Sequence, residues 1–167
     1  MIFKDLQLTK SNCFVAMQYY WLMLNRTYLV ILTSDALVGI VANGLVSDEG
    51  NDALANYVVR KLVVRGNLDD PFTYVKTHYT EKVAELDLDG DEIIAQNGAN
   101  FRLYYQDISA VDYDPKRKWG MGKYPHDGKI YIQSKNGKTI ELIVLGNQSG
   151  AHIRALILAK VEKVSHK

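Results

Sequence analysis

The chain has 167 residues, of which 47% are hydrophobic and 23% are charged, and its formal net charge is +1 at pH 7. This length predicts one domain, residues 1–167, with a core large enough to need neither a disulfide nor a metal. The near-zero net charge argues against a dedicated nucleic-acid-binding protein, because such proteins usually carry a large basic excess.

The single cysteine, Cys13, excludes an intramolecular disulfide and is typical of a reducing compartment. The four histidines are scattered, without the spacing of a zinc site, so we expect no metal and no cofactor. Residues 1–5 lack the cationic and apolar regions of a signal peptide, and the uncharged run 11–24 is too short and too polar to span a bilayer. We therefore expect a cytoplasmic protein, with peripheral attachment to a membrane as a second option.

The N-terminal part of the chain is rich in apolar runs. Residues 14–24 are dense in aromatic and aliphatic side chains, and their pattern leaves a strand and a buried helix both open. Residues 27–33 and 36–42 are apolar runs separated by the polar pair Ser34-Asp35, which predicts two strands joined as a hairpin.

The stretch from about 48 to 83 has apolar residues at helical spacing. Gly66-Asn67 is typical of a helix end, and Asp70-Pro71 is typical of a helix start with aspartate as the N-cap. We therefore expect a helical insertion of two short helices between two strand regions.

The second strand region is better defined than the first. Asn97-Gly98 and Asn136-Gly137 are turn signals between apolar runs, and the second is the strongest hairpin signal in the chain because both of its residues tolerate positive φ. The strands expected here are 91–96, 100–105, 108–113, 129–135 and 138–145.

A terminal helix is expected from about residue 150, with Ser149 as its N-cap. Its apolar residues recur at steps of three and four, which places one stripe against the core and leaves the charged residues mostly off it. The stripe consists of Ile153, Leu156, Ile157, Val161 and Val164.

The order of these elements resembles the pleckstrin-homology-like superfold, and in particular its bacterial and GRAM-type members. The likeness rests on the hairpin at 28–40, the strand at 107–111 and the closing hairpin at 128–142. It implies an α+β fold in which a seven-stranded antiparallel bent sheet or barrel is closed at one end by the C-terminal amphipathic helix. The helical insertion departs from the family pattern, and no functional residue of the family transfers to this chain.

Residues 114–129 interrupt the strands with three glycines, two of the three prolines and five of the twenty lysines and arginines. Such a segment cannot form a helix or a regular strand, so we expect a long loop. Its cations and flat aromatic rings suit an anion or a partner protein. The candidate binding residues are Lys116, Arg117, Lys118, Trp119, Lys123 and Tyr124.

A structural interpretation of the same loop is also open, with solvated lysines and with Trp119 folded back on the barrel beneath a cation. His126-Asp127 is interpreted as part of a turn in which Asp127 bonds its own backbone, and an acid–base pair is the alternative.

The leading functional hypothesis is a non-enzymatic binding or scaffolding module. Its loop 114–129 would contact a protein partner or a phosphate-bearing, anionic membrane surface. A self-associating assembly protein, hence a homo-oligomer, is the alternative. An enzyme with an unrecognised site has the least support, because the sequence pairs no nucleophile with a base.

Overall fold

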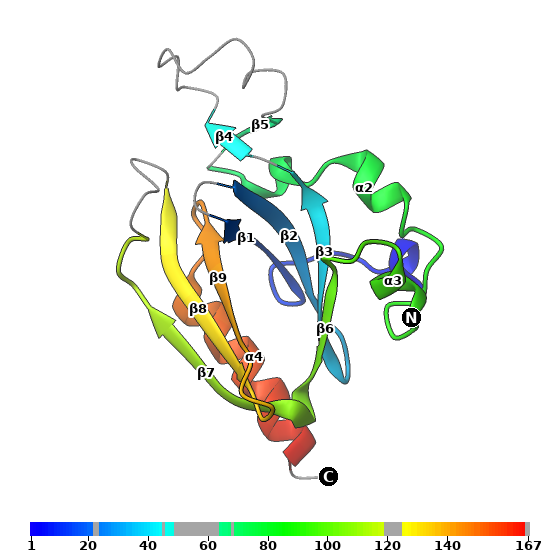
Figure 1. The fold of residues 1–167 in the computed structure, drawn as a ribbon, viewed down its shortest axis with the longest axis vertical. Helices are drawn as coiled ribbons and strands as arrows, with labels where there is room; N and C mark the ends of the chain where they lie inside the picture. Colours follow the sequence, from blue (N-terminus) through cyan, green and yellow to red (C-terminus); the bar gives the residue numbers. More distant parts are fainter. Residues whose placement is uncertain (22–23, 45, 49–63, 68, 119–124, 166–167) are drawn as a thin grey trace.

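Seven antiparallel strands form one curled sheet, a half-barrel, with a long helix at the C-terminus (Figure 1). The computed structural model describes residues 1–21, 24–44, 46–48, 64–67, 69–118 and 125–165. The strand order is β6-β3-β2-β1-β9-β8-β7, so the first strand of the chain lies beside the last. The bounds are β1 Cys13–Trp21, β2 Leu24–Leu32, β3 Ala36–Asn43, β6 Phe101–Tyr104, β7 Ile108–Asp114, β8 His126–Ser134 and β9 Thr139–Leu145.

In the segment 14–24, for which the pattern left two possibilities open, Leu24 begins β2 and residues 14–21 belong to strand β1. Strand β1 pairs with β2 from Cys13, opposite Ile31, to Trp21, opposite Leu24. Because β1 and β2 lie in the middle of the sheet and are covered on both faces, they form nearly continuous apolar runs, which a helix can also show.

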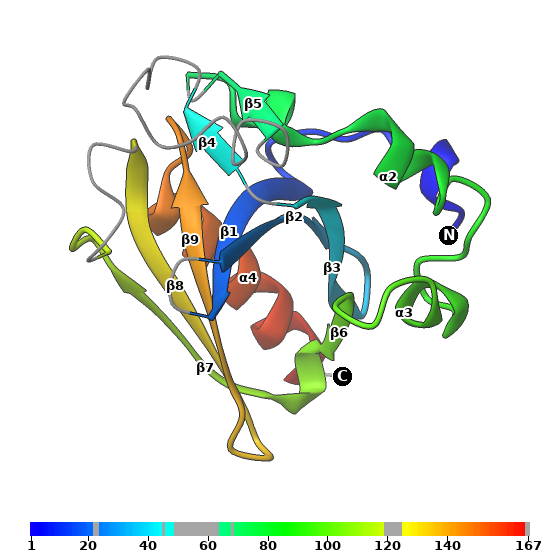
Figure 2. The same cartoon turned by 45° about the horizontal axis from the view of Figure 1, so that its top comes forward.

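The inner face of the sheet carries a hydrophobic cluster to which all seven strands contribute. The terminal helix α4 (Gly150–Ser165) lies against this face, beside β7, β8 and the short 3₁₀ turn η3 (Tyr105–Asp107). Figure 2 shows α4 within the curl of the sheet. The expected α+β architecture, a bent antiparallel sheet with a C-terminal helix, is therefore confirmed.

The apolar stripe of α4 faces the inner cluster as expected. Ser149 caps the helix, since its Oγ accepts a hydrogen bond from the backbone N–H of His152 at 3.2 Å. Two stripe residues, Ile153 and Ile157, are buried. The other three, Leu156, Val161 and Val164, are half-buried and pack against the cluster.

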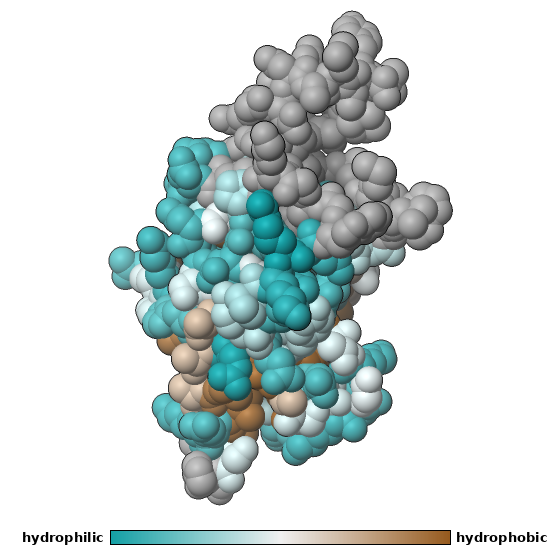
Figure 3. Space-filling view, turned by 90° about the vertical axis from the view of Figure 1, so that its left-hand side faces the viewer, coloured by the Kyte–Doolittle hydropathy of each residue, from teal (hydrophilic) through white to brown (hydrophobic). Residues whose placement is uncertain are grey.

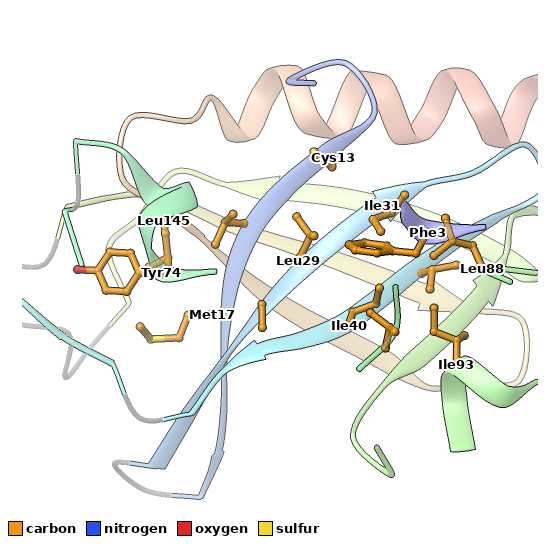
Figure 4. Packing of buried hydrophobic residues seen from close by; sticks show 14 of the residues in the cluster. Phe3, Cys13, Met17, Leu29, Ile31, Ile40, Tyr74, Leu88, Ile93 and Leu145 are labelled. Atoms are coloured by element: carbon orange, nitrogen blue, oxygen red, sulfur yellow. The ribbon is translucent and has the colours of Figure 1, made fainter. Parts of the chain in front are cut away.

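A second cluster covers the outer face of β1, β2 and β3 (Figure 4). Its cover comes from the N-terminal turn η1 (Phe3–Asp5) and from the chain between 71 and 95, which supply Phe3, Tyr74, Leu88 and Ile93. Backbone hydrogen bonds hold the two covering segments together, for example from Phe3 N to Leu86 O at 3.0 Å. Both faces of the central strands are thus removed from water.

The helical insertion expected at 48–83 falls partly on residues 49–63, which lie outside the described part of the chain. Around it, β4 (Val46–Asp48) and β5 (Val64–Gly66) form a short parallel pair. The predicted helix end at Gly66 is therefore wrong, because Gly66 is the last residue of β5 and pairs with Asp48 of β4. The start at Asp70-Pro71 is confirmed: Asp70 caps η2 (Pro71–Tyr74), which leads into α2 (Thr77–Glu81).

The predicted strand at 91–96 is also wrong, because a short helix, α3 (Glu92–Ala95), forms there. The reason is tertiary and involves Asn100. Its side-chain oxygen accepts from Val41 N at 2.8 Å, and its side-chain nitrogen donates to Ile93 O at 2.7 Å. This buried amide ties the α3 turn to β3 and places Ile93 in the outer cluster.

Candidate functional site

The segment 114–129 leaves the sheet at the end of β7 and returns at the start of β8. Asp114 lies opposite Lys129 in the register of these strands, and their side chains form an ion pair at 2.7 Å. The described residues 115–118 form neither helix nor strand, as expected of a loop. The stem of the loop is therefore held closed by paired strands and by one ion pair.

The β8 strand begins earlier than expected, at His126, and has a bulge between His126 and Lys129. Gly128 lies in this bulge with φ of 71°, a backbone conformation that favours glycine. Asp127 does not bond its own backbone as in the expected turn. Its carboxylate instead accepts from Gly150 N at 2.7 Å, which stabilises the start of α4.

The predicted binding residues occupy different environments. Lys116 and Arg117 are exposed, and the backbone N–H of Lys116 donates to Asp114 Oδ1 at 2.9 Å, which shapes the start of the loop. Lys118 is half-buried, and its ammonium forms an ion pair with Glu141 of β9. Lys118 thus braces the loop against the sheet. Trp119, Lys123 and Tyr124 lie outside the described residues.

His126 lies near the charges of Arg117 and Lys129 and beside the backbone of Lys118, an environment that the sequence did not predict. Its Nδ1 faces the backbone N–H of Gly128 at 3.1 Å, and its Nε2 faces that of Lys118 at 3.3 Å. The neutral ring can accept one of these two hydrogen bonds, whereas the protonated ring carries a hydrogen on both nitrogens and can accept neither. Burial, followed by the charges of Arg117 and Lys129, lowers the pKa of His126 below its ordinary value.

The lowered pKa of His126 follows from its neighbours in the fold and not from its own sequence context. Its immediate sequence, Pro-His-Asp-Gly, is typical of a turn, whereas the cations that surround it come from both ends of the loop. Figure 3 faces the β7–β8 side of the molecule, where hydrophilic residues cover much of the described surface. The stem of the loop thus holds an imidazole whose protonation is opposed by burial and by the charges of Arg117 and Lys129.

We expect His126 to make the fold less stable below its ordinary pKa of about 6.5. Below this pH the unfolded chain binds a proton at His126 more readily than the folded chain does. The contribution of His126 to the free energy of unfolding is therefore fully present above about pH 6.5 and is lost as the pH falls through the folded pKa. Urea unfolding, about one pH unit above and below 6.5, would measure the loss. The His126→Gln variant should lose less over the same interval, and an equal loss in both proteins would contradict the assignment.

In the described part of the chain, no cluster of three histidine, cysteine or acidic side chains is arranged to hold a metal ion. None of the described helices has the length and apolar character needed to cross a bilayer. Cys13 is buried, its thiol donates to Thr9 O at 3.2 Å, and burial raises its pKa to about 11. The thiol is therefore protonated at neutral pH.

No protein-family model matches the chain, and no curated protein matches its sequence. Among solved structures, the chain is similar to the C-terminal domain of an unknown protein from Leishmania infantum, at 11% identity and a TM-score of 0.41. The likeness covers 90% of this chain and 78% of that one.

Proposed function

We propose that this chain is a non-enzymatic binding module of pleckstrin-homology-like type, which holds an anionic ligand against the stem of the 114–129 loop. One observation carries the proposal. Four cationic side chains lie at this stem: Lys129 and Lys118 form ion pairs with Asp114 and Glu141, and Lys116 and Arg117 are exposed.

The path of the chain supports the pleckstrin-homology-like part of the proposal. The sheet is bent and seven-stranded, its first and last strands are neighbours, and the terminal helix lies on its inner face. The bent seven-stranded sheet and the C-terminal helix packed on it are features that the sequence resemblance implies. The cover over the outer face, contributed by 1–6 and 71–95, is an addition that the resemblance does not account for.

The binding role is favoured over an enzymatic one by the state of the strongest nucleophile. The Cys13 thiol is buried and stays protonated at neutral pH, because burial raises its pKa to about 11. His126 borders cations and backbone donors, and the Asp127 carboxylate is occupied by the start of α4. This neighbourhood suits an anion, whose arrival would also ease the protonation of His126.

Reversing two exposed charges should abolish most of the binding to an anionic surface. We expect the Lys116→Glu/Arg117→Glu variant to bind vesicles containing phosphatidylserine at least about tenfold more weakly than the parent, since each basic residue contributes about 1 kcal/mol at such a surface. Co-sedimentation at low and high salt would measure this. Vesicles of phosphatidylcholine alone should bind neither protein.

The matched control reverses Lys135 and Lys138, which are exposed at the opposite end of β8. This variant has the same net charge, so an equal loss of binding would point to general attraction and overturn the proposed site. Titration with inorganic phosphate, followed by NMR at His126 and residues 116–118, separates a phosphate site from a requirement for a membrane. If neither phosphate nor the anionic vesicles bind, the proposal is wrong.

A further inference from the structure

A cavity of about 230 Å³ opens beside the first turn of α4, outside the surface described above. Its floor is formed by Cys13 and Phe14 at the start of β1 and by Ile153 of α4, all buried. Lys10 and His152 line it as well, and both are exposed. The cavity thus combines an apolar interior with a basic rim.

The cavity exists because β9 is paired with the middle of β1 and does not reach its N-terminal end at Cys13. The two strands pair only at Ala16 and Met17. At the next position, the side chain of Gln148 takes the place of a strand: its oxygen accepts from Val15 N at 2.9 Å, and its nitrogen donates to Val15 O at 2.7 Å and to Leu145 O at 2.8 Å. Beyond this amide, the start of β1 has α4 as its neighbour, and a space is left between them.

The position of Lys10 is fixed by its own turn. The backbone N–H of Thr9 donates to Asn12 Oδ1 at 2.8 Å, and the Asn12 side chain donates to Gln7 O at 2.8 Å. His152 is fixed by the first turn of α4, where its N–H bonds the Ser149 cap. The two basic side chains are therefore presented from ordered backbone, which lowers the entropy lost when a ligand binds.

The charge of the rim is not balanced locally. None of the lining residues is acidic, and no carboxylate in the described part of the chain forms an ion pair with Lys10. The volume lies below the roughly 300–1,000 Å³ typical of sites for drug-sized ligands, so an occupant must be small. An apolar floor under a basic rim suits a molecule with a short hydrocarbon body and one negative group.

We propose that this cavity binds a small organic monocarboxylate, with its hydrocarbon body on Phe14 and Ile153 and its carboxylate directed at Lys10 and His152. This site is separate from the loop proposed above to hold an anion, and it differs from it in requiring an apolar body. Acetate and inorganic phosphate should therefore be poor ligands of the cavity.

The test uses the whole chain and three probes, hexanoate, 1-hexanol and acetate, followed by ¹H–¹⁵N NMR. We expect hexanoate to shift the amides of Cys13, Phe14 and residues 148–153 in a saturable way, at concentrations at least about tenfold below those needed for the other two probes. Equal response to hexanoate and 1-hexanol would overturn the role of the rim. Absence of saturable shifts at these residues would overturn the site.

Two matched variants decide whether the rim acts as stated. Lys10→Gln/His152→Gln removes both basic groups, which are exposed, and is expected to weaken hexanoate binding about tenfold. Lys163→Gln/His78→Gln removes the same residue types at exposed positions elsewhere and should leave it unchanged. Equal effects of the two pairs would contradict the proposal, and the NMR spectrum of each variant reports directly whether it is folded.

Discussion

Replacement of Gly128 by alanine is expected to destabilise the fold by about 3 kcal/mol or more, a large fraction of the roughly 5–15 kcal/mol that stabilises a native protein. The residue has φ of 71°, a conformation that costs a non-glycine residue about 1–2 kcal/mol. An added Cβ would also lie 2.8 Å from Pro115 Cα and still closer to Asp114 O. These are backbone atoms at the end of β7 and just beyond it, so no side-chain rotation relieves the contact.

The chain provides a matched control in Gly137, which has φ of 85° in the β8–β9 turn and no atom within 4 Å of an added Cβ. Gly137→Ala carries the conformational cost alone and should lose about 1–2 kcal/mol. Urea denaturation of both variants measures the difference, which reports the steric part at Gly128. Equal losses would mean that the backbone at Asp114 and Pro115 does not lie as close to Gly128 as the structure shows.

The Gly128 variant also bears on function. The glycine lies between His126 and Lys129, and the second of these forms the ion pair with Asp114 that closes the loop. A variant that still folds is therefore expected to shift the NMR signals of residues 116–118 and to bind anionic vesicles less well. Gly137→Ala, at the far end of β8, should leave both unchanged.

Truncation of Ile157 to alanine has the second largest expected effect, a loss of about 2–5 kcal/mol. The side chain is 0% exposed and lies in the inner cluster, where no rearrangement of the surface can fill the space that it leaves. Alanine is the better helix former, so α4 itself gains slightly from the change. A net loss therefore measures how tightly the helix is packed on the sheet.

The comparison is with Val164→Ala, on the same stripe but half-buried near the end of α4. This change should cost less than Ile157→Ala, because fewer contacts are lost and the end of a helix relaxes more easily. Chemical denaturation gives both values. If the two substitutions cost the same, α4 is not held on the inner face by the contacts around Ile157.

The three cations that follow one another at the start of the 114–129 loop do not share one environment in the fold. From sequence, Lys116, Arg117 and Lys118 form one cationic group, whereas in the structure Lys118 is bound to Glu141 and half-buried. Glu141 lies on β9, more than twenty residues along the chain, so its proximity depends on the register of β8 with β9. The roles of Trp119, Lys123 and Tyr124 stay predictions.

The sequence by itself determined the parts of the protein whose signals are local. The Asn136-Gly137 hairpin is encoded by turn chemistry, and α4 by its cap and its apolar stripe, so both were predictable. The fold class followed from the order of these elements. The basic character of 114–129 was also evident, because composition needs no knowledge of neighbours.

Only the tertiary structure decided which of these residues meet. Residues 14–21 form a strand because β2 pairs with them, and 92–95 form a helix because the Asn100 amide ties them to β3. The cavity beside Gln148 likewise depends on residues far apart in the chain, and the environment of His126 depends on the pairing of β7 with β8. A local pattern specifies the conformations that a segment favours. The hydrogen bonds and burial that select one of them come from partners that only the folded chain brings together.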